Sequence, residues 1–332
     1  MLRSVTVGRP ISSKPKMTRL FRIGLPILAI IFCSGLAPGF SGTHDENNAC
    51  DPAVQNASQT IRDNYITTTD GAQIHYLQAG KTTAEPAIVF IPGWTLSASL
   101  WNQELRTFSA GRLAVAVESR SQGESSKMLS GNTPERRAVD LQELIGALHI
   151  SKFVIVGWSQ GAQDVAAYIQ QFGTETLSGV VFVDSPVSAG AAEVDIHKEF
   201  SKVILSRLSS LDANPAEYSE ALVKSIFSKP HPELDMQRLI EESEKTPPTI
   251  GTAMLAMDIF GVDRRPALKK INRPALVIAS AGSPLLEAQK EMAGKIPEAR
   301  LVVVEGAGHA VFIDDPEKFD AALSQLLRDA DR

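Results

Sequence analysis

The pentapeptide Gly157-Trp158-Ser159-Gln160-Gly161 is the segment of this chain whose residue types and spacing point most directly to chemistry. A serine with a glycine two residues before it and another two residues after it is typical of a tight turn that exposes a nucleophilic hydroxyl. The pattern also occurs by chance, so its context decides. Here the apolar run Phe153–Val156 precedes it and the helical stretch Gln160–Gln171 follows it, as a nucleophile elbow requires. We therefore predict that Ser159 is a catalytic nucleophile.

A serine hydroxyl is a weak nucleophile and needs a neighbouring base, most often a histidine. Of the six histidines, His309 follows the late apolar run Leu301–Val304, so its ring is expected to reach Ser159 across the strand ends. The other five are expected in polar loops, in an early hairpin strand or on a helix: His44, His75, His149, His197 and His231. They form no HExxH or paired-ligand spacing, and no dinucleotide or phosphate loop is present, so we predict neither metal nor cofactor.

Alternating apolar runs and helical stretches are the elements that must position these residues. Continuous apolar runs indicate strands buried on both faces, and helices between them indicate a mostly parallel sheet with helices on both sides, an α/β fold. The first two strands are expected to form an antiparallel hairpin around Asp70-Gly71. The predicted strands are Tyr65–Thr68, Gln73–Leu77, Ala87–Ile91, Leu113–Val117, Phe153–Val156, Val180–Val183, Ala275–Ile278 and Leu301–Val304. The predicted helices are Pro134–Leu148, Gln160–Gln171 and Pro316–Leu327.

One long segment, between Asp184 and Pro274, interrupts this alternation. It carries four helical stripes and no strand signal, so we predict a helical lid over residues 185–265 that divides the core into residues 64–184 and 266–332. The alternative is a set of ordinary packing helices. The most apolar stripe, Thr252–Phe260, fits a hydrophobic pocket roof and fits simple packing on the core equally well.

Together these segments resemble the α/β-hydrolase superfamily from about residue 64 to 330, and in particular the bacterial arylesterases and cofactor-free haloperoxidases. Pro92-Gly93-Trp94 is similar to their His-Gly-Trp oxyanion loop, with proline in place of histidine. Residues 118–125 resemble the Asp-x-Arg-Gly-x-Gly-x-Ser loop, with glutamate and serine replacing aspartate and the first glycine. Residues 306–309 and 315–319 look like the catalytic-histidine loop and the final helix.

The resemblance also implies an oxyanion hole formed by the backbone N–H groups of Trp94 and Gln160, although the Trp94 side chain is an equally good candidate to line the acyl pocket. In most members the triad acid follows the strand after the lid, but here Ser283 occupies that place. Asp184, at the end of the preceding core strand, is our predicted acid, because the histidine needs a carboxylate to orient it. Two alternatives are that Asp184 merely caps the turn into the lid, and that Glu287 is the acid.

The N-terminus has the character of an export signal. A basic segment that ends at Arg22 precedes the apolar run Ile23–Ala37, which is shorter than the roughly 20 residues of a membrane span. We predict a signal peptide within residues 1–42, or a retained membrane anchor as the alternative, and a flexible leader over residues 43–63. The mature chain would then keep only Cys50, which excludes an intramolecular disulfide.

Charge and composition narrow the function further. The chain has 33 basic and 38 acidic residues, and residues 1–42 hold six of the basic ones and no acid, so the rest of the chain is strongly acidic. Nucleic acid is therefore a poor candidate partner. No stable protein partner is indicated. The sequence predicts an exported, periplasmic or secreted, serine hydrolase that cleaves a small-molecule ester or lactone through an acyl-enzyme. The alternatives are perhydrolysis or C–C bond hydrolysis on the same fold, and a non-catalytic ligand-binding protein.

Overall fold

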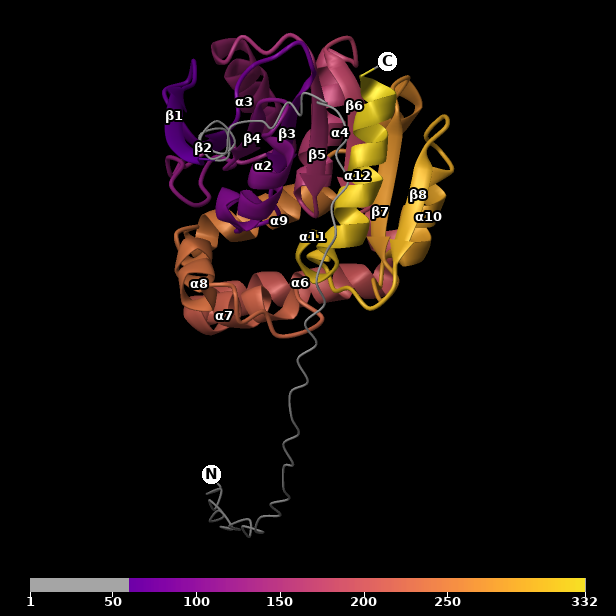
Figure 1. Cartoon of the computed structure of the whole chain (residues 1–332). Helices are drawn as coiled ribbons and strands as arrows, with labels where there is room; N and C mark the ends of the chain where they lie inside the picture. The colour runs from indigo at the N-terminus through magenta and orange to yellow at the C-terminus, as the bar shows by residue number, and fades with distance from the viewer. Residues whose placement is uncertain (1–59, 332) are drawn as a thin grey trace, which may run out of the picture. The chain divides into compact units, whose positions relative to one another are not determined.

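The computed structural model describes residues 60–331, which form an α/β unit around one eight-stranded sheet (Figure 1). The strand order is β1-β2-β4-β3-β5-β6-β7-β8; the pairs β1/β2 and β2/β4 are antiparallel and all the others are parallel. The predicted fold class is therefore confirmed. The strands are β1 Arg62–Thr67, β2 Gln73–Ala79, β3 Ala87–Ile91, β4 Ala114–Val117, β5 Phe153–Trp158, β6 Leu177–Val183, β7 Ala275–Ser280 and β8 Arg300–Val304.

The first strand differs from the sequence prediction. It begins at Arg62 rather than Tyr65, because Arg62 and Asp63 pair in register with Gln78 and Leu77 of β2. This edge strand is polar and largely exposed, so it has no apolar run to mark its start. The predicted leader 43–63 thus extends two residues too far, and the core begins before residue 64. The predicted signal peptide or anchor and the rest of the leader, including Cys50, lie outside the described residues.

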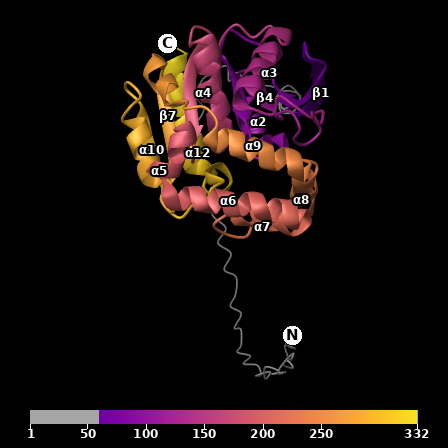
Figure 2. The same cartoon turned by 180° about the vertical axis from the view of Figure 1, so that it is seen from behind.

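Helices cover both faces of the sheet, as the central strands require. Strands β3, β4, β5 and β7 are buried at every residue. Figure 1 shows α12 in front of the sheet, and Figure 2 shows α3 and α4 on the opposite side. Helix α3 begins with Thr133 as N-cap and Pro134 in its first turn. The helices of the core are η1 Ala98–Trp101, α2 Asn102–Phe108, α3 Pro134–Ala147, α4 Gly161–Phe172, η3 Arg265–Lys270, α10 Leu286–Ala293, α11 Val311–Asp314 and α12 Pro316–Ala330.

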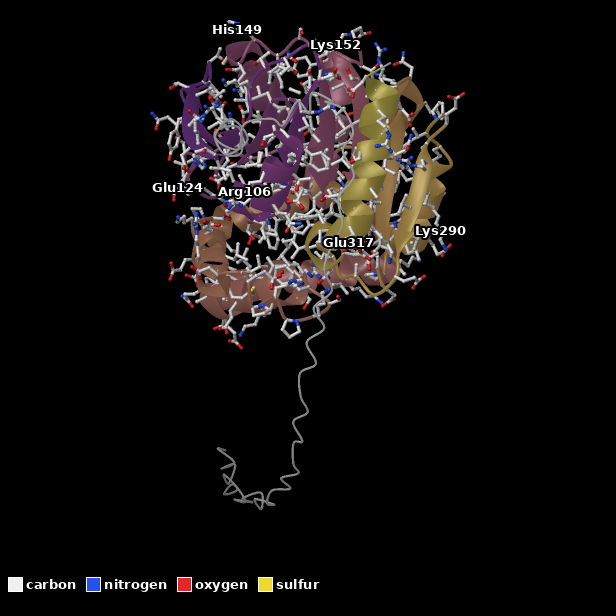
Figure 3. All side chains as sticks on the ribbon, viewed as in Figure 1. Arg106, Glu124, His149, Lys152, Lys290 and Glu317 are labelled. Atoms are coloured by element: carbon white, nitrogen blue, oxygen red, sulfur yellow. The ribbon has the colours of Figure 1, made fainter. Side chains whose placement is uncertain are left out.

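The segment between β6 and β7 is helical, as predicted, and we call residues 185–265 the helical insertion. The first predicted stripe is divided, because the chain leaves the helical conformation at His197. The insertion lies across one end of the sheet, and His149 and Lys152 lie at the opposite end (Figure 3). No helix within residues 60–331 has the length and apolar character needed to cross a membrane. The insertion consists of η2 Gly190–Ala192, α5 Glu193–Ile196, α6 Lys198–Ala213, α7 Pro215–Ser225, α8 Met236–Glu244 and α9 Pro248–Phe260.

Two carboxylates on α2 and α12, the buried Glu104 and the half-buried Asp320, have no cationic partner within the described residues. Both carboxylate oxygens of Glu104, and Oδ1 of Asp320, are buried and have no hydrogen-bond partner within the described residues. Burial raises the pKa of Asp320 to about 6 from its ordinary value of 3.8, and it raises the pKa of Glu104 as well. Because the native pKa of Asp320 exceeds the unfolded one, folding takes up protons between these values. The contribution of Asp320 to the free energy of unfolding therefore falls as the pH rises from about 4 to about 6.

We expect Asp320→Asn to stabilise the fold at pH 8, where the buried charge is otherwise present in full. The gain should be on the order of 1 kcal/mol once the partial exposure of the side chain is allowed for, and it should disappear below pH 4. Urea unfolding at pH 4, 6 and 8 measures it. The exposed Glu317 on the same helix (Figure 3) supplies the control, since Glu317→Gln removes a charge that is already solvated. An equal gain from both variants would contradict the burial argument.

Candidate active site

Ser159 lies on a strained turn directly after β5. Its φ angle is +55°, a value that non-glycine residues seldom adopt. The flanking glycines are sterically required, since a Cβ atom at Gly157 would lie 2.4 Å from the carbonyl oxygen of Gly161, and one at Gly161 would lie 2.7 Å from that of Ile91. The Ser159 N–H donates to the Val183 carbonyl at 3.0 Å, so the turn continues the β5–β6 ladder. The strand–turn–helix geometry expected of a nucleophile elbow is thus present.

His309 lies in the loop after β8, and this loop is held from several sides. The carbonyl of His309 accepts from the Trp158 indole at 2.9 Å, and the Gly308 N–H donates to the buried Asp314 carboxylate at 2.6 Å. Gly308 is needed for close approach rather than for flexibility, because a Cβ atom there would lie 2.7 Å from the Ser228 backbone nitrogen. The loop therefore presents the His309 ring in a fixed position.

Asp184 directly follows β6, and its side chain reaches His309. Its Oδ2 accepts from His309 Nδ1 at 2.7 Å, and the aspartate side chain is 2% exposed against 34% for the histidine. An ionised carboxylate can only accept, so Nδ1 carries the proton and Nε2 remains free as a base. No hydrogen bond joins the Ser159 hydroxyl to this ring in the part of the chain that the structure describes, although both residues line one cavity.

The other positions considered for the triad acid, Glu287 and Ser283, provide no carboxylate to His309. Glu287 lies on α10 with its side chain 85% exposed, and it pairs with Lys290 at 2.8 Å. The Ser283 hydroxyl lines the cavity and carries no charge. Asp184 also does not cap the Ser185-Pro186 turn, because its second oxygen accepts from the N–H of Ser280 across the sheet edge at 2.9 Å. Among the candidates weighed from the sequence, Asp184 alone reaches His309.

Gln289 is a site residue that sequence reasoning missed. It is fully buried on α10, and its side-chain amide nitrogen donates to Asp184 Oδ1 at 3.1 Å and to Ser283 Oγ at 3.2 Å. Its own amide oxygen has no partner within residues 60–331. A glutamine 105 residues from Asp184 in an ordinary amphipathic helix gives no sequence signal of this contact. The same amide thus joins the aspartate to the serine at the usual acid position.

The two predicted oxyanion donors lie beside the elbow. The backbone N–H groups of Trp94 and Gln160 donate to no acceptor within the described residues, so both are free for a ligand. The Trp94 side chain turns to the helical insertion, where its indole N–H donates to the Gly251 carbonyl at 2.9 Å. Trp94 is also one of the residues that line the cavity. The indole N–H is therefore occupied, whereas the backbone N–H of Trp94 is not.

Gln122 fixes the loop that carries the first of these donors. Its side chain accepts from the Thr95 N–H at 2.9 Å and donates to the carbonyls of Gly93 and Leu96, each at 3.1 Å. The hydrogen-bond network also assigns the Gln160 amide an orientation in which it donates to Gln122 at 3.1 Å. The loop that carries Trp94 and the turn that carries Gln160 are therefore connected by hydrogen bonds between buried side-chain amides.

A buried ion cluster beneath the site connects the core to the insertion. Arg137 of α3 pairs with Asp164 of α4 at 2.7 Å and with Asp258 of α9 at 2.6 Å. Burial raises the pKa of Asp258 to about 6, and the guanidinium opposes that shift. Asp258 also lines the cavity, so α9 is attached to the core directly beside the site.

The cavity itself has a volume of about 350 Å³, at the lower end of the range for small-molecule sites. Apolar side chains of the insertion form much of its wall: Phe200, Ile204, Leu222, Ile226, Leu255 and Ile259. The opposite wall comes from the loops after β3, β5, β6, β7 and β8. Within the described residues no group of three or more His, Cys, Asp or Glu side chains gathers as a metal site would need. The arrangement is suited to acyl transfer at a serine.

Comparison with known proteins gives the same result. The family model described as "Alpha/beta hydrolase family" matches residues 88–322. A non-heme chloroperoxidase of Kitasatospora aureofaciens is 26% identical over 279 residues, which cover 79% of this chain and 98% of that protein. A bifunctional esterase/perhydrolase of Acinetobacter calcoaceticus is 30% identical over 122 residues, 36% of this chain and 44% of that protein.

Solved structures agree on the fold. A bromoperoxidase from Bacillus anthracis superposes with a TM-score of 0.71 at 24% identity and covers 81% of this chain and all of its own. An esterase from Exiguobacterium antarcticum has the same TM-score at 22% identity, with 80% and 100% coverage. The elbow, the histidine loop and the strand order have thus led to one family. The chain belongs to the alpha/beta hydrolase family.

Proposed function

We propose that this enzyme is an exported serine hydrolase that cleaves a carboxylic ester or lactone through an acyl-enzyme intermediate. The hydrogen bond from His309 to Asp184, at the cavity that Ser159 lines, is the observation that carries the proposal. A serine on a strained elbow, a histidine held in one tautomer and a buried carboxylate are what nucleophilic acyl transfer needs. The relatives include esterases and perhydrolases, which supports the reaction class.

The steps follow from the roles of these groups. His309 Nε2 takes the proton of the Ser159 hydroxyl as its oxygen attacks the substrate carbonyl carbon, and Asp184 stabilises the imidazolium that forms. The N–H groups of Trp94 and Gln160 receive the oxyanion. The imidazolium then gives its proton to the departing alcohol oxygen, which leaves an acyl group on Ser159. Water attacks this ester with His309 again as the base, and the acid is released.

Export and the lid are the finer parts of the proposal. The basic segment and the apolar run Ile23–Ala37 support export, with a signal peptide removed or retained as an anchor. The apolar cavity wall supplied by α6, α7 and α9 supports a lid role for the helical insertion. In that role the insertion excludes bulk water from the acyl-enzyme and favours substrates with an apolar portion.

Perhydrolysis is the second candidate, since the names of several relatives favour it. The chemistry differs only in the second half, where hydrogen peroxide in place of water attacks the acyl-enzyme and a peracid leaves. The same residues serve both reactions. The choice between them is a matter of relative rates rather than of different machinery.

A panel of p-nitrophenyl esters with acyl chains of two to twelve carbons, together with a set of lactones, tests the proposal. We expect saturable hydrolysis with a preference for short and medium chains, which the cavity volume admits. Peracid formation is measured alongside in the presence of hydrogen peroxide. No turnover of any ester or lactone by the purified enzyme would refute the proposed function, and a peracid yield above the hydrolysis yield would favour the second candidate.

We also expect Gln289 to be a positioning residue that acts through Asp184. The Gln289→Met variant keeps the side-chain volume but removes the donor to Asp184 Oδ1, so kcat should fall about tenfold while KM stays near its original value. A double-mutant cycle separates this role from a merely structural one. In an Asp184→Ala background, which removes the oxygen that Gln289 binds, the second substitution should have little further effect on kcat. Additive losses would contradict the assignment.

A further inference from the structure

One charged side chain on the cavity wall has no counter-ion. The charged or titratable residues that line the cavity are Asp184, Arg207, Asp258 and His309. Asp184 and His309 bind each other at 2.7 Å, and Asp258 binds Arg137 at 2.6 Å. Arg207 makes no ion pair and no hydrogen bond with any residue of the described chain 60–331. Arg207 is therefore the one charged residue lining the cavity that has no partner of opposite charge within residues 60–331.

Arg207 lies on the face of α6 that lines the cavity. Phe200, Ile204 and Arg207 all line the cavity, and their spacing of four and three residues places them along one face of the helix. Phe200 is half-buried and Ile204 is buried, whereas Arg207 is exposed. The cavity-lining face of α6 thus changes from apolar at Phe200 and Ile204 to cationic at the exposed Arg207.

Two other cations of the insertion are paired with carboxylates of their own helices. Lys202 on the same helix pairs with Glu199 at 2.7 Å, and Arg238 on α8 pairs with Glu242 at 2.8 Å, each one helical turn away. Neither Lys202 nor Arg238 lines the cavity. Arg207 has no acidic side chain within 4.0 Å, so its guanidinium is free to receive an anion.

We propose that Arg207 binds a carboxylate carried by the substrate at a distance from the bond that is cleaved. The substrate class is then an ester or lactone with an apolar middle portion and a free carboxylate at the far end, such as a half-ester of a dicarboxylic acid. A guanidinium binds a carboxylate through two parallel N–H···O bonds, and the apolar wall before it accommodates the chain between the two polar ends. This inference rests on the proposed function and specifies its substrate.

Matched pairs of substrates test the proposal. For the acyl side, the mono-p-nitrophenyl esters of six- to nine-carbon dicarboxylic acids are compared with the same esters in which an amide replaces the free carboxylate. For the alcohol side, 4-carboxyphenyl butyrate is compared with 4-carbamoylphenyl butyrate. The quantity measured is the ratio of kcat/KM for the anionic ester to kcat/KM for its neutral partner. Wild type, Arg207→Gln, Arg207→Lys and the control Lys202→Gln are assayed at low and high salt.

We expect a ratio above one in the wild type on one of the two sides, which identifies the part of the substrate that carries the carboxylate. The ratio should fall about tenfold in Arg207→Gln and less in Arg207→Lys, which keeps the charge but loses the paired donors. It should remain intact in Lys202→Gln and decline at high salt. If the wild type cleaves the esters but the ratio of anionic to neutral kcat/KM is near one on both sides, the inference is overturned while the proposed function stands. The same holds if Lys202→Gln changes the ratio as much as Arg207→Gln does.

A binding measurement separates the two proposals fully. Calorimetry of the Ser159→Ala variant with the anionic and neutral esters requires no turnover. Tighter binding of the anionic ester that is lost on Arg207→Gln supports anion recognition even if no ester is hydrolysed, in which case only the proposed function fails. Equal affinities for the two esters would refute the role of Arg207 directly.

Discussion

Replacing Ser159 by alanine should lower kcat by on the order of 10⁶-fold, by the precedent of other enzymes that use a serine nucleophile. The alanine variant keeps the elbow but has no oxygen to attack the substrate, so what remains is catalysis by the oxyanion donors and by binding alone. The side chain is small and φ at this position is +55° for either residue, so the free energy of unfolding should change by less than about 0.5 kcal/mol. Ester hydrolysis and urea unfolding measure the two quantities.

A fluorophosphonate probe supplies a second readout for the same residue. It should label Ser159 in the wild type and leave the alanine variant unlabelled, as mass spectrometry of the modified peptide would show. The matched control is Ser225→Ala, since Ser225 also lines the cavity but its hydroxyl donates to the Leu222 carbonyl at 2.8 Å within α7. Undiminished hydrolysis by the purified Ser159 variant would remove the serine from the mechanism.

Replacing Asp184 by asparagine should lower kcat by on the order of 10⁴-fold, by triad precedent. Two donors, the Ser280 N–H and the Gln289 amide, already bind one oxygen of this side chain. They will hold the oxygen of an asparagine in the same place, so its NH₂ group must face His309 Nδ1. That ring nitrogen then has to accept, and the proton moves to Nε2. Ser159 thereby loses its base.

A second substitution tests the unusual position of the acid. Ser283 shares the Gln289 amide with Asp184, so an aspartate at residue 283 should bring a carboxylate close to the His309 ring. We expect Ser283→Asp to recover about 10- to 100-fold of the activity lost in Asp184→Asn, and to give no gain in the wild-type background. Steady-state hydrolysis of the best ester of the panel measures both variants. Near-normal kcat in Asp184→Asn alone would place the acid elsewhere.

Features that depend on neighbouring residues could be predicted from the sequence. Each central strand carries its own continuous apolar run, so its place in a doubly covered sheet follows from local composition. The elbow around Ser159 is equally local, since a strand, a small-residue turn and a helix follow one another within twenty residues. His309 can be identified because it lies in the loop that follows the last strand. The family, which the match over residues 88–322 confirms, follows from these same segments.

Contacts between distant segments could not be predicted in this way. The pairing of Asp184 with His309 spans 125 residues, and its choice over Glu287 depends on the parallel register of β6 beside β7 and on the φ angle of +45° at Asp184. Gln289 reaches the same carboxylate only because α10 packs against β7. The start of β1 depends on its partner strand, because a polar edge strand has no pattern of its own. A local sequence pattern indicates which face of a segment is buried. Which side chains of other segments contact that face depends on how the strands and helices pack in the folded protein.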